Sequence, residues 1–223
     1  MAARHASAVP SQWGTDVTGV LRRTGGGGIA LTLDACGSVG GKGYDRALID
    51  GLVSRKVPAT LFLNQRWIDA NPVLARTLAG DPLFEIGNHG TAHKPLSVTG
   101  RSAYGLAGTR SAREAADEVY GNHRRIQRLT GRAPRFFRAG TAHYDEVAVA
   151  IVGDLGERVA GFSVNADNGA TAGSALVRAN VAAAGPGDIV LAHMNHPGGG
   201  TAAGLLAAVD DHLARGTRFV RLR

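Results

Sequence analysis

Two histidines stand four residues apart in the segment EIGNHGTAHKPLS, at positions 89 and 93. On a helix this spacing would place two imidazoles on one face, as in helical zinc sites. A helix is disfavoured here, because Gly87 and Gly90 flank His89 and Pro95 follows His93. The pair is therefore predicted to lie in a loop at the end of a strand. Two imidazoles in such a loop suit zinc and similar divalent ions.

Short β-branched runs alternate with longer amphipathic stretches along most of the chain, and these elements would position the pair. This alternation predicts an α/β fold with a parallel sheet, and about seven β/α units favour a closed or nearly closed barrel. We expect residues 1–28 to form an N-terminal extension and residues 29–223 a single domain. Ser111 and Glu114 match a capping box, and Gly131 is a helix stop. Strands are predicted at 29–36, 58–64, 83–89, 135–140, 159–167 and 187–195, and helices at 44–56, 67–80, 111–131, 145–156, 174–185 and 201–216.

Charged and metal-binding side chains stand at the predicted carboxyl ends of most of these strands. In parallel α/β folds such ends meet at one rim, where the chemistry collects. We therefore expect one shared site on that rim. The residues at these strand ends are Asp34, His89, His93, Arg138, Asn165, Asp167, His193, Asn195 and His196.

The setting of several rim residues suggests what they do. Asp34 ends an apolar strand, where an unpaired acid costs stability, so a functional role or a place as third metal ligand is predicted. Arg138 ends an aromatic segment and would pair with a rim carboxylate, which lowers the pKa of that acid and fixes its orientation. His193 follows the apolar run IVLA and is predicted to act as a general acid or base. Cys36 has two interpretations, a small buried hydrophobe or a thiolate ligand.

Composition narrows the class of protein. The 223 residues are 44% hydrophobic and contain no apolar run near the ~18 residues of a membrane-spanning helix, so no membrane span is expected. The opening MAARHASAVPSQWG lacks the apolar region of a signal peptide. Cys36 is the only cysteine, which excludes an internal disulfide. The net charge of +7 comes mainly from scattered arginines, and aromatic content is 5%, so a solvated surface is favoured over a nucleic-acid site.

The rim residues and their motifs resemble the polysaccharide deacetylases with a NodB homology domain, carbohydrate esterase family 4. The resemblance runs from about Ile29 to the C-terminus and implies a distorted (β/α) barrel with fewer than eight strands, here a (β/α)7 barrel. The motifs that carry it are TLDACG, HGTAH, FFRAG, SVNADNG and LAH. The roles that it implies are a catalytic base, Asp34, oriented by Arg138; two metal ligands, His89 and His93; and a general acid, His193, supported by Asp167.

The first motif departs from the family at its second acid. Ala35 stands where the family usually has a metal-ligating aspartate. Three outcomes stay open: Asp34 becomes the ligand, Cys36 reaches the metal, or the two histidines hold it weakly in an impaired enzyme. An intact enzyme with altered metal geometry is favoured, because Arg138 and His193 are both present.

The resemblance implies a metal-dependent hydrolase that removes N-acetyl groups from amino-sugar polymers, either peptidoglycan or a chitin-like glycan. Its metal would be zinc, with cobalt, nickel or manganese as alternatives, and its partner an N-acetylated glycan. The competing functions are an O-acetyl esterase or small-molecule amidase on the same scaffold, and a non-catalytic glycan-binding module with an impaired metal site. A secreted or cell-wall location is expected, after removal of any signal peptide, while a cytoplasmic location stays open.

Overall fold

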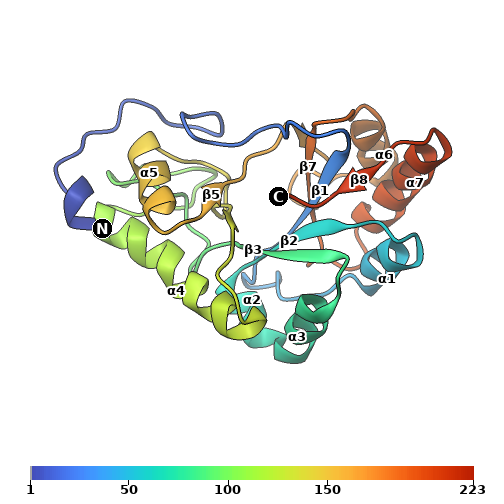
Figure 1. Ribbon diagram of the computed structural model, residues 1–223, viewed down its shortest axis with the longest axis horizontal. Coiled ribbons are helices and arrows are strands. Elements are labelled where there is room, and N and C mark those ends of the chain that lie inside the picture. The colour runs from blue at the N-terminus through green and yellow to red at the C-terminus, as the bar shows by residue number, and fades with distance from the viewer. Residues whose placement is uncertain (1) are drawn as a thin grey trace.

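A parallel sheet forms the centre of the computed structural model, which describes residues 2–223 (Figure 1). The strands run in the order β5-β4-β3-β2-β1-β7-β6, and β8 pairs with β1 outside this path. The pairings between these strands are parallel, so their carboxyl ends meet at one rim. The strands are β1 (Ile29–Ala35), β2 (Ala59–Leu63), β3 (Phe84–Asn88), β4 (Phe136–Phe137), β5 (Arg158–Val159), β6 (Val164–Asn165), β7 (Ile189–His193) and β8 (Phe219–Val220).

The sheet curves into a half-barrel that is left open between its edge strands, β5 and β6. A segment from the N-terminal part of the chain lies along β5, where the Leu21 N–H donates to the Val159 carbonyl at 2.9 Å. Two residues further on, Arg23 forms an ion pair with Asp188, directly before β7. The predicted distorted (β/α)7 barrel in a single domain is confirmed, with an open side in place of full closure.

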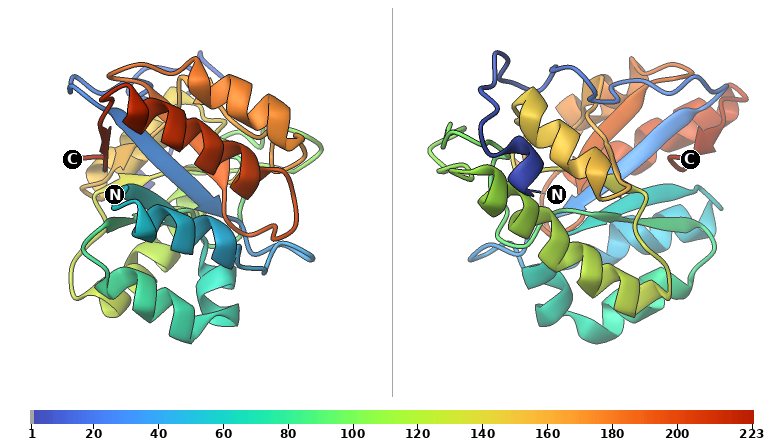
Figure 2. Two further views of the ribbon diagram at one scale, coloured as in Figure 1. Left: turned by 90° about the vertical axis from the view of Figure 1, so that its right-hand side faces the viewer. Right: turned by 60° about the vertical axis from the view of Figure 1, so that its left-hand side comes forward.

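Helices cover the outside of the curved sheet in two groups (Figures 1 and 2). α6, α7 and α1 pack beside β1 and β7, while α4 and α5 pack together beside β3 and β5. Within residues 2–223, no helix combines the length and the apolar character needed to cross a membrane. The helices are η1 (Ala2–His5, a 3-10 helix), α1 (Arg46–Ser54), α2 (Gln65–Ala70), α3 (Pro72–Gly80), α4 (Ala112–Thr130), α5 (Glu146–Asp154), α6 (Ser174–Ala182) and α7 (Thr201–Ala214).

Two predicted elements are divided in the structure. The single helix predicted at 67–80 is α2 followed by α3, because Pro72 begins a new helix, where its missing N–H is not needed. The strand predicted at 159–167 is β5 and β6 with a break between them. In that break, the carbonyls of residues 160 and 161 accept hydrogen bonds from the Arg138 guanidinium, so they are used to hold a side chain.

α4 begins and ends where the sequence predicts. The Ser111 hydroxyl accepts a hydrogen bond from the Glu114 N–H at 3.1 Å, and Gly131 closes the helix with a φ of 76°. The buried face of this helix reaches the end of β3, where the Asn122 side chain donates to Asn88 Oδ1 at 2.9 Å. The helix therefore supports the loop that carries the paired histidines.

The side chains of β1 alternate between two environments, as expected for a strand. Leu33 and Ala35 belong to the apolar core between the sheet and the helices. Thr32 and Asp34 face the inside of the half-barrel, where both contact the Arg138 guanidinium at 2.8 Å. This alternation determines which residues near the end of β1 can contribute to a site.

Candidate functional site

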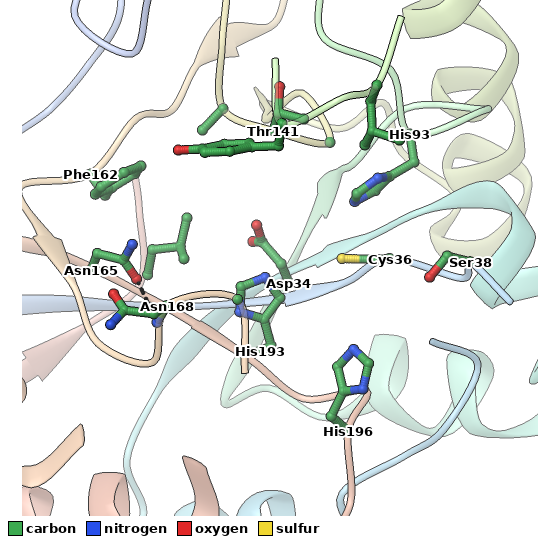
Figure 3. A pocket seen from close by; sticks show the side chains of 16 residues that line it. Asp34, Cys36, Ser38, His93, Thr141, Phe162, Asn165, Asn168, His193 and His196 are labelled. Atoms are coloured by element: carbon green, nitrogen blue, oxygen red, sulfur yellow. Dashed lines mark hydrogen bonds between the residues drawn. The ribbon is translucent and has the colours of Figure 1, made fainter. Parts of the chain in front are cut away.

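A cavity of about 500 Å³ opens at the carboxyl ends of the strands, where the sequence predicts the site (Figure 3). The Asp34 carboxylate, the Cys36 sulfur and the His193 ring lie around the same space in Figure 3. The structure thus brings together predicted residues that are far apart in the sequence. Asp34, His93, Asn165, His193 and His196 line the cavity, while His89, Arg138 and Asp167 contact these residues from behind.

Asp34 and His193 occupy paired positions on the neighbouring strands β1 and β7. Asp34 is 3% exposed, and its Oδ1 accepts a hydrogen bond from Arg138 Nη1 at 2.8 Å. Burial raises the pKa of Asp34, but the charges of Arg138, His89 and His193 more than offset this effect, so the net pKa lies below its ordinary value. The carboxylate is therefore ionised at neutral pH and able to accept a proton.

Arg138 is fully buried, and every side of its guanidinium is engaged. Besides its carboxylate partner, it donates to the Thr32 hydroxyl at 2.8 Å and to the carbonyls of Ala160 and Gly161 at 3.1 and 2.8 Å. The ring of Phe62 lies 4.3 Å from the guanidinium carbon. These contacts fix the arginine and, through it, the direction of the carboxylate.

His193 is held by the carboxylate of Asp167. Asp167 Oδ1 lies 2.9 Å from His193 Nδ1, and Oδ2 accepts hydrogen bonds from the His193 N–H at 2.8 Å and the Thr201 hydroxyl at 2.9 Å. Burial lowers the pKa of His193, but the hydrogen bond and charge of Asp167 outweigh burial, with Cys36 contributing, so the pKa lies well above its ordinary value. Because Nδ1 faces Asp167, Nε2 is the nitrogen that can exchange a proton with a ligand.

Three side chains with metal-binding donors gather beside this pair. The Cys36 sulfur and one ring nitrogen each of His89 and His93 lie within 4.8 Å of one another. His89 Nδ1 lies 2.8 Å from the Arg138 carbonyl, which can only accept a hydrogen bond, so Nδ1 carries a proton and Nε2 is the ring nitrogen that can bind a cation once it has lost its own proton. His93 Nε2 is buried and has no hydrogen-bond partner among the described residues. A thiol and two imidazoles, one of them with an unsatisfied buried nitrogen, fit a borderline divalent ion such as zinc.

The loop after β3 holds His93 in the left-handed backbone region, with a φ of 60°. This conformation costs a non-glycine residue about 1–2 kcal/mol, so the surroundings must enforce it. The Glu118 carboxylate of α4 accepts hydrogen bonds from the backbone N–H of Ala92 at 2.9 and 3.0 Å and of Lys94 at 3.2 Å. Glu118 therefore holds the loop on both sides of the histidine. Gly90 makes room for it, because a Cβ at this position would clash with Glu118 Oε1.

Gly90→Ala is expected to destabilise the protein and to weaken its affinity for zinc. Gly90 has a φ of 76°, so alanine costs about 1–2 kcal/mol in conformation, and the clash with Glu118 adds to this loss and displaces His93. Urea unfolding gives the free energy of unfolding, and zinc titration gives the affinity. Gly131→Ala is the matched control: it has the same φ of 76°, and its added Cβ meets no atom within 4 Å. Equal losses of stability in both variants, with unchanged zinc affinity, would contradict the role given to Glu118.

The sequence analysis did not identify Tyr104, Glu118 or the side chain of Thr141 as parts of the site, and one rim residue, Asn195, does not face the cavity. Thr141, whose hydroxyl is buried without a partner among residues 2–223, and Tyr104 both line the cavity. Neither carries a motif, and Glu118 is indistinguishable from other helical acids in the sequence. Asn195 is on the predicted rim, but its side chain donates to the Gly41 carbonyl at 2.8 Å and holds the loop after β1.

The open parallel barrel with a rim cavity is the architecture of the NodB-like carbohydrate esterases. The family model described as polysaccharide deacetylase matches residues 22–160, and the chain belongs to this family. The matched segment contains Asp34, His89, His93 and Arg138, the residues of the first three motifs. The resemblance noted in the sequence is confirmed. No curated protein sequence matches the chain at a significant level.

Solved structures of carbohydrate esterase family 4 share the fold. The pseudoenzyme BA3943 from Bacillus anthracis is 20% identical, with a TM-score of 0.73 over 90% of this chain and 66% of its own. The peptidoglycan N-acetylglucosamine deacetylase Bc1960 is 22% identical, with a TM-score of 0.73 over 92% of this chain and 91% of its own. PdaA from Bacillus subtilis is 23% identical, with a TM-score of 0.70 over 91% and 81%. This chain therefore spans about two thirds of the length of BA3943 and most of the other two.

Proposed function

We propose that the protein is a metal-dependent hydrolase that removes N-acetyl groups from an amino-sugar polymer, either peptidoglycan or a chitin-like glycan. The observation that carries the proposal is the pairing of Asp34 with His193 across one cavity, each held by a buried partner of opposite charge. One group is arranged to accept a proton and the other to donate one, as amide hydrolysis requires. Membership of the polysaccharide deacetylase family supports this activity.

His89 and His93 would hold the metal, zinc by the chemistry of the donors, with cobalt, nickel and manganese as alternatives. Such an ion, when bound, makes water more acidic and polarises a carbonyl group. The cluster lies directly beside Asp34, since His89 Nε2 is 3.6 Å from Asp34 Oδ2. The donors of the cluster and the proposed base therefore serve one reaction centre.

In the proposed reaction, Asp34 accepts a proton from the water that attacks the N-acetyl carbonyl. Arg138 keeps the carboxylate ionised and aimed into the cavity. A backbone N–H near Gly140 or Thr141, two residues that line the cavity, would donate to the carbonyl oxygen as negative charge develops there. His193, with Nδ1 held by Asp167, donates the proton on Nε2 to the departing nitrogen. The products are acetate and a free amino sugar.

A polymeric substrate is supported by the setting of Tyr104 at the cavity. Ala103 and Leu106 exchange two backbone hydrogen bonds, so Tyr104 and Gly105 form a two-residue turn. Tyr104 has a φ of 52°, an unfavourable value for tyrosine, and is 82% exposed, with its ring edge-on to His143 at 5.2 Å. An exposed aromatic ring in this position can pack against the apolar face of a sugar ring.

Tyr104→Ala is expected to raise the KM for N-acetylglucosamine oligomers rather than to lower kcat. Loss of the ring contact costs about 1–1.5 kcal/mol, which corresponds to roughly 5- to 12-fold in KM. Steady-state acetate release with a tetramer measures the effect, and Tyr104→Phe should keep the wild-type KM. Tyr120→Ala on α4, an exposed tyrosine that does not line the cavity, is the control. An unchanged KM in Tyr104→Ala would remove Tyr104 from substrate binding.

Acetate release from N-acetylglucosamine oligomers, with zinc or cobalt added, tests the proposed function. Wild type should release acetate, His89→Ala should not, and His5→Ala, which changes a histidine that pairs with Asp154, should behave as wild type. Acetate released only from O-acetyl xylan, or from small amides, would favour the esterase or the amidase instead. Oligomer binding without turnover in wild type and His89→Ala would favour a glycan-binding module, an alternative supported by Ala35 and by the likeness to the pseudoenzyme BA3943.

Zinc, the cell-wall substrate and a secreted or wall-associated location are parts of the same proposal. The names of Bc1960, a peptidoglycan N-acetylglucosamine deacetylase, and PdaA, a family 4 carbohydrate esterase, support a glycan of this type. The net charge of +7 would favour an anionic polymer over a neutral one. Comparing acetate release from peptidoglycan and from chitin oligomers distinguishes the two substrates.

A further inference from the structure

The missing aspartate of the first motif has an explanation in the direction of the side chains at the end of β1. Ala35 is fully buried in the apolar core between the sheet and the helices. No side chain at this position of the present backbone would point into the cavity, because neighbouring residues of a strand face opposite sides. Cys36, one residue later, lines the cavity together with Asp34. At the end of β1, positions 34 and 36 therefore belong to the cavity and position 35 belongs to the core.

The Cys36 sulfur lies at the proposed metal donors rather than in a purely apolar pocket. It is 3.8 Å from His89 Nε2, and both lie within 4.8 Å of a ring nitrogen of His93. Donor atoms bound to one tetrahedral zinc at ~2.0–2.3 Å are separated by about 3.3–3.7 Å, so small side-chain adjustments would bring all three to one ion. The buried, unpartnered His93 Nε2 is an independent sign that the cluster requires a further atom.

We propose that Cys36 is the third protein ligand of the metal and binds as a thiolate, in place of the aspartate carboxylate that the family usually supplies. On binding, the thiol gives up its proton to solvent and the sulfur coordinates the cation beside the two imidazoles. A site of one sulfur and two nitrogens is softer than one with a carboxylate. It selects zinc or cobalt over magnesium, calcium and manganese. The inference concerns the metal of the proposed function but does not depend on turnover.

Asp34 is the competing third ligand, because its Oδ2 lies 3.6 Å from His89 Nε2. Two observations favour the sulfur. The other oxygen of Asp34 is held by Arg138 at 2.8 Å, so the carboxylate is already paired with a fixed cation. Asp34 is also absent from the group whose donor atoms lie mutually within 4.8 Å, whereas Cys36 belongs to it. Assigning the metal to Cys36 leaves Asp34 available as the base.

Cobalt titration of the metal-free protein tests the assignment directly. Wild type is expected to bind one equivalent of cobalt and to develop the intense near-ultraviolet absorption of sulfur-to-cobalt charge transfer. Cys36→Ser should lose this band and bind zinc and cobalt about 100-fold more weakly or worse, since loss of supporting contacts alone costs 10- to 100-fold. Cys36→Asp should bind cobalt without the band. Ser38→Ala, an exposed neighbour at the same cavity, should keep both properties.

A second measurement on the wild-type protein covers the case in which a Cys36 variant does not fold. Alkylation of the single cysteine by iodoacetamide is followed by mass spectrometry with and without zinc, and bound zinc should suppress it. Stoichiometric cobalt binding without the charge-transfer band, or alkylation unaffected by bound zinc, would overturn the proposal. Unchanged zinc affinity in Cys36→Ser combined with loss in Asp34→Asn would assign the position to Asp34 instead.

These measurements contain no glycan, so their outcome is separate from that of the proposed function. A thiolate-bound cobalt spectrum in a protein that releases no acetate would contradict the deacetylase activity alone. Acetate release by a protein whose cobalt shows no sulfur ligand would contradict the assignment of Cys36 alone.

Discussion

Asp34→Asn is expected to lower kcat for N-deacetylation by about 10²- to 10⁴-fold, the range for loss of a positioned general base. The amide of asparagine has no basic oxygen at neutral pH, so it cannot take the proton of the attacking water. It still offers an acceptor to the buried Arg138 guanidinium, which lies 2.8 Å from Asp34 Oδ1, but it leaves that charge without a counter-ion, so a loss of stability of about 3–5 kcal/mol is also expected. Steady-state acetate release measures kcat, and far-ultraviolet circular dichroism measures folding.

The matched control for this variant is Asp117→Asn, on the solvent-facing side of α4, where the Asp117 side chain is 64% exposed. It makes the same chemical change outside the cavity and should leave kcat at the wild-type value. Zinc content should also be unchanged in Asp34→Asn, because the carboxylate is assigned to proton transfer. A folded Asp34→Asn protein with wild-type kcat would show that another group is the base.

His193→Asn is expected to reduce hydrolysis of N-acetylated oligomers by about 10²- to 10⁴-fold and to spare hydrolysis of an activated aryl acetate. Asparagine can still donate to Asp167, which lies 2.9 Å from His193 Nδ1, but it has no proton donor in the place of Nε2. An amine must be protonated as it departs, whereas a nitrophenolate leaves without a proton. The ratio of the two activities therefore reports on the acid itself.

Both substrates are measured on the same preparations of wild type and variant, with thermal unfolding as the check on folding. His5→Asn, which alters the partner of Asp154, is the control and should keep both activities. An equal loss on the amide and on the aryl ester would mean that His193 positions the substrate or the fold, and does not donate a proton. A loss confined to the amide would support the general acid.

Patterns in the sequence were sufficient to predict the class of fold and most of the rim. Alternating β-branched and amphipathic segments require a parallel sheet, and parallel strands place their carboxyl ends on one edge. Asp34 and His193 could be placed together from this rule, and the structure puts them at paired positions of β1 and β7. The predicted ends of α4 are also confirmed, since Ser111 caps the helix and Gly131 closes it in the left-handed conformation.

Which of the two interpretations of Cys36 is favoured depends on contacts that exist only in the folded protein. A small buried hydrophobe and a thiolate ligand have the same local sequence, because the choice depends on a loop 53 residues away in the chain. Packing brings His89 to 3.8 Å from the sulfur, with Glu118 of α4 holding the backbone around His93. Tyr104 likewise lines the cavity because of tertiary packing, and no sequence motif indicates the position of its turn. Contacts between distant segments depend on packing rather than on local propensity. Local patterns in a single sequence therefore do not predict which distant residues meet.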